Sequence, residues 1–449
     1  MSVKGIVPYA DSVETLGRAE VKDESGAVVQ DKRYYKAIYA NQIVSPKIDA
    51  MDAATASKAD NSKVDNLVGM IGGANAPCYY ERDSGFIANS KTIIKTPSEL
   101  WININKQGYK LETQLSIDLS NDSAWYTDAK QWQPSHAYVE NDVVFPETKK
   151  GYLYRCTTGG TSSTLTPTFP ETLGQTYQDG SVVWICQLDY TQAANRAGKD
   201  YYIYACSPTS GSVPNIIISD NSTVPLWYQA ANSRKIGGFH TLCVDVGTIA
   251  NHPLSGYVLG DILPASVWDL KHRPKSSPEG MVYIEGIDLW VDIYLASHSG
   301  SATERKLISK YNGITADGTS SPTYCDYDFI ETFGKQNKRL LWQHEYECAT
   351  QGSPQGVAIL GAADPNTTGG HKATNNIRIV SNLGLEDGCG VLWTWTSDYF
   401  SYQTTYSHGV VGGAWSGGAS CGSRCVNCNP VGYLNAGSGA RGASEPLAV

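Results

Sequence analysis

The sequence predicts a multidomain, mainly β protein that ends in an α+β domain. Its 449 residues exceed the usual length of one domain. Its 44 Gly and 20 Pro favour turns and short strands over long helices. Short apolar runs such as ELWININ, DYYIYAC and NIIIS, separated by Gly, Asn and Pro, are typical of strands. We therefore expect β-rich N-terminal and middle domains ahead of the α+β domain.

The composition argues against several classes of partner. A net charge of −9 disfavours nucleic-acid binding, which needs basic surface to neutralise phosphates. No run of 18 apolar residues is present, so we expect no membrane insertion. The opening MSVKGIVPYADSVETLG lacks the apolar core of a secretory signal, which indicates synthesis in a cytoplasm. Eleven cysteines, an odd number in a large chain, predict mostly free thiols.

The character of the sequence changes three times along the chain. Residues 1–75 carry short alternating runs and then, at 46–73, an Ala-, Asp-, Lys- and Ser-rich stretch that is either a short helix in need of partners or a linker. We expect this segment to serve attachment and oligomerisation. Residues 76–128 with 190–235 are expected to form a β domain, interrupted by a unit at 129–189. Residues 236–449 are expected to form one α+β domain.

The unit at 129–189 is rich in aromatic residues and Asp-Gly turns. It resembles the small chitin-binding-type modules that recur in chitinases and phage tail proteins. The resemblance implies that aromatic rings stack on sugars, while the competing interpretation is that the same rings form the small core of the module. The candidate carbohydrate-binding residues are Trp132, Tyr138, Tyr154 and Trp184.

Three segments of the last domain carry most of the information. In NKRLLWQHEYECATQGSPQG, the spacing of Leu340, Leu341, His344 and Cys348 predicts a helix that ends at Gly352. In NLGLEDGCGVLWTWTSDYF, a Gly/Asp turn precedes a strand with two tryptophans on one face. The third segment, GGAWSGGASCGSRCVNCNPVGYLNAGSGARGAS at 412–444, has neither helical nor strand periodicity.

In this order the three segments resemble the formylglycine-generating-enzyme domain, a variant of the C-type lectin fold. The resemblance implies a C-type lectin-like domain at 236–449. The matching residues are Lys338, Arg339, Leu340, Glu345, Glu347, Ala349, Gly352, Gly384, Leu385, Asp387, Gly390, Trp393, Trp395, Gly412, Gly413, Trp415, Arg424, Gly439 and Arg441.

The enzyme branch of that family binds copper through two cysteines and calcium partly through an asparagine. Gly417 and Gly422 stand at the two copper positions here, and the nearby Cys421 is displaced by one residue. Val391, which cannot ligate, stands at the calcium position. We therefore expect no cofactor and no metal of that kind.

The third segment more closely resembles the variable proteins of diversity-generating retroelements, which include phage tropism determinants. CGSRCVNC and GARG carry the likeness. The resemblance implies a fixed scaffold, to which we assign Trp415, Arg424 and Arg441, with both arginines binding carbonyls or a carboxylate inside the domain. It also implies an exchangeable, receptor-facing set, which is Ser416, Ser420, Val426, Asn427, Asn429, Val431, Gly432, Tyr433, Leu434, Asn435, Ala436 and Ser438.

Two further constellations admit chemical interpretations. Cys421, Cys425 and Cys428, with Cys389 as a fourth thiolate, have a spacing compatible with zinc, although buried free thiols are the favoured interpretation and a disulfide is a third. Two carboxylate pairs, Asp288 with Asp292 and Glu345 with Glu347, could serve a glycosidase, although solvated or capping roles are favoured.

Together these features predict a phage or prophage tail receptor-binding protein, located at the tail tip or tail fibre and without enzymatic activity. Its expected partners are a host surface receptor, protein or glycan, and other tail proteins through the N-terminus. The resembling systems imply a homotrimer, and many copies on one virion would turn weak contacts into high avidity. With Tyr433 as its only aromatic, the exchangeable set indicates weak single-site affinity, a different ligand or a sequence in a poorly binding state. The alternatives are a polysaccharide-binding or depolymerising tail protein and a formylglycine-generating-type enzyme.

Overall fold

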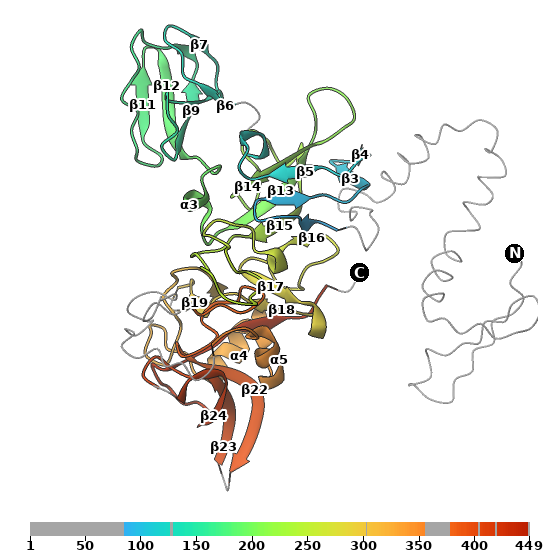
Figure 1. The fold of residues 1–449 in the computed structure, drawn as a ribbon, viewed down its shortest axis with the longest axis vertical. Helices are drawn as coiled ribbons and strands as arrows, with labels where there is room; N and C mark the ends of the chain where they lie inside the picture. The colour runs from blue at the N-terminus through green and yellow to red at the C-terminus, as the bar shows by residue number, and fades with distance from the viewer. Residues whose placement is uncertain are drawn as a thin grey trace, which may run out of the picture. The chain divides into compact units, whose positions relative to one another are not determined.

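The computed structural model describes residues 85–125, 129–301, 303–354, 378–402, 405–417 and 420–447. Within these residues the chain is mainly β, as predicted, and its α-helices are the short α3 (Ala193–Arg196), α4 (Asp326–Lys335) and α5 (Gln343–Ala349) (Figure 1). The segment expected at 1–75, with its helix or linker at 46–73, lies outside the described residues. None of the helices described is long and apolar enough to cross a membrane.

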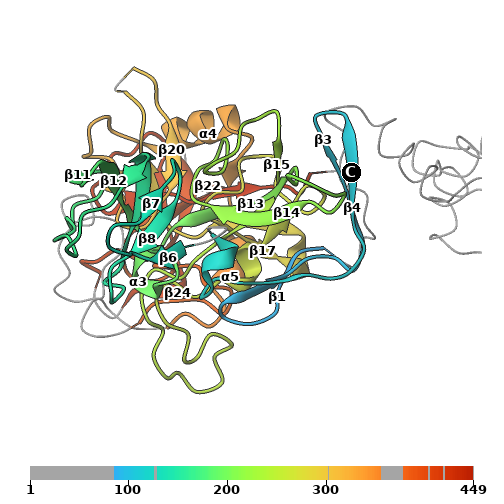
Figure 2. The same ribbon diagram turned by 90° about the horizontal axis from the view of Figure 1, so that it is seen from above.

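The middle of the chain is built on an antiparallel sheet in the order β14-β13-β15-β16. The runs DYYIYAC and NIIIS form β13 (Asp200–Cys206) and β14 (Asn215–Ser219), which lie side by side in both views (Figure 1, Figure 2). β15 (Ser233–His240) and β16 (Trp268–Asp269) complete the sheet. The domain boundary expected between residues 235 and 236 falls inside β15. The sheet also continues beyond that point, because β15 pairs with β16, which ends at Asp269.

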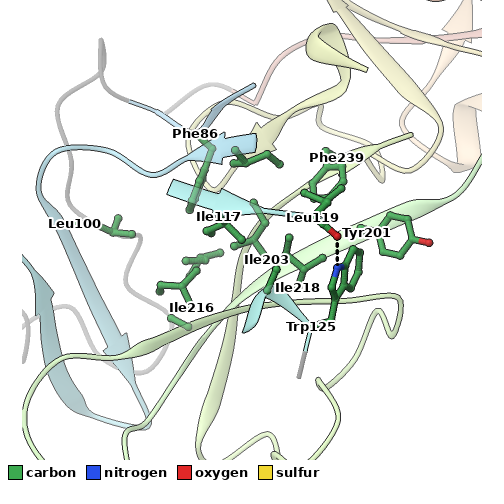
Figure 3. Packing of buried hydrophobic residues seen from close by; sticks show 14 of the residues in the cluster. Phe86, Leu100, Ile117, Leu119, Trp125, Tyr201, Ile203, Ile216, Ile218 and Phe239 are labelled. Atoms are coloured by element: carbon green, nitrogen blue, oxygen red, sulfur yellow. Dashed lines mark hydrogen bonds between the residues drawn. The ribbon is translucent and has the colours of Figure 1, made fainter. Parts of the chain in front are cut away.

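Segments on both sides of 129–189 share one apolar core. Figure 3 shows Phe86, Ile117 and Leu119 packing with Ile203 and other residues of the β13–β15 region. The Trp125 indole donates to the Leu119 carbonyl (2.9 Å) within this core. The early strands that contribute to it are β1 (Ile87–Ala88), β2 (Ile93–Lys95), β3 (Leu100–Ile104), β4 (Gln107–Leu111) and β5 (Ser116–Asp118). A core shared by segments on both sides of 129–189 is what an insertion at 129–189 requires.

The unit at 129–189 has a sheet and a core of its own. The sheet has the order β11-β12-β9-β8-β6, and β7 pairs separately with β10. Its core contains the four candidate carbohydrate-binding rings, as described below. The strands are β6 (Ala129–Gln131), β7 (Ala137–Tyr138), β8 (Val143–Phe145), β9 (Tyr152–Thr158), β10 (Gly160–Thr161), β11 (Thr176–Asp179) and β12 (Val182–Leu188).

The C-terminal region contains two four-stranded sheets and a hairpin, with α4 and α5 beside them. One sheet, β17-β18-β26-β21, brings the end of the chain between β18 and β21. The other, β24-β23-β22-β25, is formed by the second and third sequence segments. The strands are β17 (Met281–Ile284), β18 (Leu289–Asp292), β19 (Ala296–His298), β20 (Leu307–Ser309), β21 (Arg339–Leu340), β22 (Trp393–Tyr402), β23 (Thr405–Gly412), β24 (Gly422–Pro430), β25 (Ser438–Gly439) and β26 (Gly442–Ser444).

The helix predicted to include Leu340 and Leu341 begins later than its periodicity indicates. Leu340 belongs to β21 and pairs with Gly442 of β26, so sheet hydrogen bonds override the helical spacing. The Glu345 carboxylate caps the start of α5 by accepting the Trp342 amide (2.8 Å). Gly352, at φ +92°, follows the helix as predicted. The strand predicted for the two tryptophans is β22.

Candidate functional site

Part of the exchangeable set lies on β24, an edge strand of the β24-β23-β22-β25 sheet, and most of the rest lies in the turn that follows it. β24 pairs antiparallel with β23, which places Asn427 opposite Val410 and Asn429 opposite His408. Within the residues described, β24 has no strand partner on its other side. Neighbouring side chains on a strand point to opposite faces, and both Val426 and Asn427 are exposed. This part of β24 is therefore accessible from both faces.

Most of the exchangeable set is accessible, as a receptor-facing role requires. Val426, Tyr433 and Leu434 are 43%, 41% and 50% exposed. Ser438 contradicts the prediction, because it is only 2% exposed and pairs with Trp393 inside the sheet. The other members are exposed or half-buried: Ser416, Ser420, Asn427, Asn429, Val431, Gly432, Asn435 and Ala436.

The turn that follows β24 is held from two sides. The Val431 amide donates to the Tyr406 carbonyl on β23 (3.2 Å). The Gly432 amide donates to Oδ1 of Asp326 at the start of α4 (2.7 Å). Gly432 has a φ of +75°, a conformation that side chains disfavour. These contacts fix the backbone of the turn while its side chains face outward.

Asp326 and His408 form a fully buried polar pair beneath this turn. The His408 Nε2 lies 3.8 Å from Oδ2 of Asp326, and both side chains are 0% exposed. Burial lowers the pKa of His408, and the nearby Asp326 carboxylate offsets this only in part. His408 is therefore neutral at pH 7. The carboxylate of Asp326 makes a shorter contact with the Gly432 amide (2.7 Å) than with His408 (3.8 Å).

The two scaffold arginines differ. Arg441 is fully buried and donates to the backbone carbonyls of Ile293 (2.7 Å) and Glu386, which confirms its predicted role. Arg424 is exposed on β24, which contradicts its assignment to the interior. Its neighbour Ser423 is buried, so alternation along the strand turns Arg424 outward.

The four cysteines considered for a zinc site lie in different environments. Cys389 and Cys421 lie in one apolar cluster with Val391, whereas Cys425 is half-buried and Cys428 is exposed. Burial raises the pKa of Cys389 to about 12 and also raises that of Cys421, so both thiols stay protonated at neutral pH. No group of three His, Cys, Asp or Glu in the described part of the chain is arranged to hold a metal ion.

The candidate acid pairs are engaged in local structure. Asp292 is buried, and its Oδ1 lies 2.6 Å from Lys338 Nζ. Asp288 instead accepts the Tyr283 hydroxyl (2.6 Å). Glu345 makes a two-pronged ion pair with Arg339, with both contacts at 2.7 Å. Glu345 therefore has the capping role that the sequence favoured, whereas Asp292 is a buried ion-paired group and neither solvated nor capping.

The candidate carbohydrate-binding rings are core residues, which corrects the prediction that they stack on sugars. Trp132, Tyr138, Tyr154 and Trp184 are 5%, 6%, 2% and 0% exposed. The buried Asp179 carboxylate accepts both indole N–H groups, at 2.8 Å from Trp132 and 3.1 Å from Trp184. With their faces packed and their polar atoms bonded, these rings have no surface to offer a sugar.

Sequence reasoning missed three exposed aromatic residues beside the exchangeable set. Tyr327, Tyr399 and Tyr406 are 52%, 61% and 68% exposed. The adjacent pair Tyr399-Phe400 carried a signal, because neighbours on a strand cannot both face the core. The structure places these tyrosines on α4, β22 and β23, around the turn that Asp326 holds.

Comparison with known proteins identifies related chains. Residues 152–269 match the family model described as the Mtd second domain. The tail fiber receptor-binding protein of Bordetella phage BPP-1 is 32% identical over 273 residues, which cover 53% of this chain and 68% of that protein.

Solved structures share the architecture. The M1 variant of the Major Tropism Determinant has 19% identity and a TM-score of 0.57, with 85% of this chain and 88% of that chain covered. The U1 variant has 19% identity and a TM-score of 0.56, with 84% and 88% covered. These likenesses confirm the predicted fold class, in which β-rich domains precede a C-type lectin-like domain.

Proposed function

Because this chain belongs to the family of phage tail-fibre receptor-binding proteins, we propose that it attaches a phage virion to its host through β24 and the turn that follows it. The observation that carries this proposal is the position of the exchangeable set. Its accessible side chains include those of the edge strand β24 and of the turn after it, where Asp326 and Tyr406 hold the backbone of Gly432 and Val431. A rigid scaffold with replaceable side chains suits a surface whose specificity changes while its fold does not.

The proposed activity is binding without catalysis, with a host receptor as the partner of the C-terminal face. The local partners of Asp292 and Glu345 support this, because a depolymerase needs carboxylates that face a substrate. We further propose that residues 1–75 join the protein to other tail proteins and that three copies assemble. These two proposals rest on the sequence alone.

Paired substitution of Tyr433→Asp and Leu434→Asp tests the proposed face. Deleting 412–444 would remove β24 to β26 and the buried Arg441, so its outcome would report on folding. Both substituted side chains are exposed, and the fold should therefore survive. We expect adsorption of purified full-length protein to host cells, followed by flow cytometry, to fall at least about tenfold.

A matched control replaces exposed apolar residues elsewhere. Val139→Asp with Leu165→Asp changes side chains that are 66% and 78% exposed in the 129–189 unit. This control should bind cells as the unchanged protein does. Normal adsorption by the Tyr433/Leu434 variant, or an equal loss in the control, would refute the proposed face.

A further inference from the structure

Three exposed tyrosines that lie outside the exchangeable set form a second surface beside it. They are Tyr327 on α4, Tyr399 on β22 and Tyr406 on β23, and we call them the tyrosine rim. Tyrosine supplies a large amphipathic contact area at a low cost in conformational entropy. Each of these residues is more than half exposed, and exposed aromatic groups of this kind mark interaction surfaces.

Tyr399 and Tyr406 lie on one face of the β22–β23 hairpin, the face on which His408 approaches Asp326 at the start of α4. The ring centroid of Tyr399 lies 3.8 Å from that of His408, which packs against Asp326 of α4. Tyr406 is two residues before His408 on the same strand, so both point to the same side. The phenol of Tyr327 is close enough to interact electrostatically with that of Tyr399.

The rim is continuous with the exchangeable turn. The Val431 amide donates to the carbonyl of Tyr406 itself, and the Gly432 amide donates to Asp326, the residue before Tyr327. The turn is therefore held by β23 on one side and by the start of α4 on the other, and each of these elements carries a rim tyrosine. Figure 1 shows the β22–β23 hairpin, to which Tyr399 and Tyr406 belong, extending past β24.

On α4, Tyr327 has charged neighbours, whereas the β22–β23 hairpin and the exchangeable turn carry few charges. From Leu392 to Ala440, the only Asp, Glu, Lys or Arg residues are Asp398 and Arg424. A strongly charged ligand would lack counter-charges here. The mixture of Tyr with Ser, Asn and Gly is the composition of antibody paratopes, in which rigid rings supply contact area to a protein partner and small polar residues supply adaptable hydrogen bonds.

We propose that the tyrosine rim is a permanent part of the receptor contact and seats an uncharged surface loop of a host protein. The rim supplies affinity that does not depend on the exchangeable residues, while those residues set specificity. This division explains how a set with Tyr433 as its only aromatic can still bind, since interface energy concentrates in a few aromatic or arginine side chains. The inference rests on the proposed function and adds fixed residues to its face.

The test compares variants on the two faces of one hairpin, in the full-length protein. Tyr399→Ser with Tyr406→Ser removes two rim rings, and Tyr406→Ser alone leaves the contact of Tyr399 with His408 intact. Phe400→Ser is the control, because Phe400 is 40% exposed and lies on the opposite side, next to Gly409. Thermal unfolding and native mass are measured for each variant, and binding to host cells is measured by flow cytometry.

We expect the double variant to lose about tenfold or more in apparent affinity and Tyr406→Ser to lose a part of this, with Phe400→Ser unchanged. Protease treatment of the cells should abolish binding, and periodate oxidation of their glycans should not. Normal binding by both rim variants overturns the inference. Loss of binding after periodate treatment alone also overturns it, because the receptor would then be a glycan. A change in the native mass of the rim variants overturns it as well, because the rim would then be a contact between copies of the chain. If the Tyr433/Leu434 variant also binds normally, the proposed function itself fails.

Discussion

Buried polar side chains decide where the exposed face of this protein lies. Asp326 is fully buried, yet its carboxylate holds the amide of Gly432 in the exchangeable turn. Arg441 is buried as well and joins the carbonyls of Ile293 and Glu386, which are far apart in sequence. Such groups cannot be replaced freely, because removing one leaves buried partners unsatisfied. They support the surface on which we propose that the exchangeable side chains lie.

Replacing Asp326 should loosen the exchangeable turn. Asp326→Ala leaves the Gly432 amide without its acceptor, at a cost of about 1–3 kcal/mol, whereas Asp326→Asn keeps an acceptor oxygen and should cost less. Hydrogen exchange of the amides at 431–433 should be faster in the alanine variant, and its binding to host cells should be weaker. Unchanged exchange in Asp326→Ala would show that the turn is held by other contacts.

Each structural element contributes either a changeable surface or a closed core. β24 is accessible because it is an edge strand, and its pairing with β23 fixes the positions from which Val426 and Asn427 project. The strands at 129–189 do the opposite, because they enclose their aromatic rings around Asp179.

Acid should destabilise the 129–189 unit through Asp179. Burial raises the pKa of this carboxyl, but hydrogen bonds from Ser163, Trp132 and Trp184 outweigh burial and bring it below its ordinary value of 3.8. The stabilisation is therefore complete above pH 3.8 and is lost as the pH falls through the lower folded-state pKa. Hydrogen exchange of the β9 and β12 amides across this range should detect the loss.

Two variants isolate the contribution of that carboxylate. Asp179→Ala leaves two buried indole N–H groups without acceptors and should cost on the order of 3 kcal/mol at neutral pH. Asp179→Asn retains an acceptor oxygen and should remove most of the acid dependence. An acid response that is identical in the unchanged protein and in Asp179→Asn would assign the effect to other groups.

The whole molecule is expected to act through several copies. The exchangeable set has few side chains of the kind that dominate binding energy, so one site should bind weakly even with help from the tyrosine rim. Linked sites on one virion convert weak contacts into slow release when their geometry allows simultaneous binding. The proposed homotrimer is therefore part of the mechanism of attachment.

Light scattering on the full-length protein measures the number of chains in the assembly. We expect a native mass of three chains of 48.6 kDa each. We also expect release from cells with dense receptors to be slower than release from cells with sparse receptors, because rebinding needs neighbouring receptors. A single-chain mass with density-independent release would contradict assembly.

The local sequence was a good guide wherever its pattern and the tertiary contacts agreed. The alternating runs form β13 and β14, and the two tryptophans lie on β22 as predicted. The pattern failed at Leu340, where pairing with β26 replaced the helix. It also failed at Ser438 and Arg424, whose burial depends on partners elsewhere in the chain: β22 for Ser438 and the edge position of β24 for Arg424.

The sequence by itself determined the family and the mainly β class, because glycine, tryptophan and cysteine spacings are local properties of the chain, and it predicted the exchangeable set. Only the tertiary structure decided which aromatic residues are available. Trp132 and Trp184 are enclosed by their own sheet, while Tyr399 and Tyr406 project from a hairpin beside the turn that Asp326 anchors. The exposure of a side chain depends on packing between distant segments, so the local sequence pattern could not decide which of these aromatic residues would be exposed.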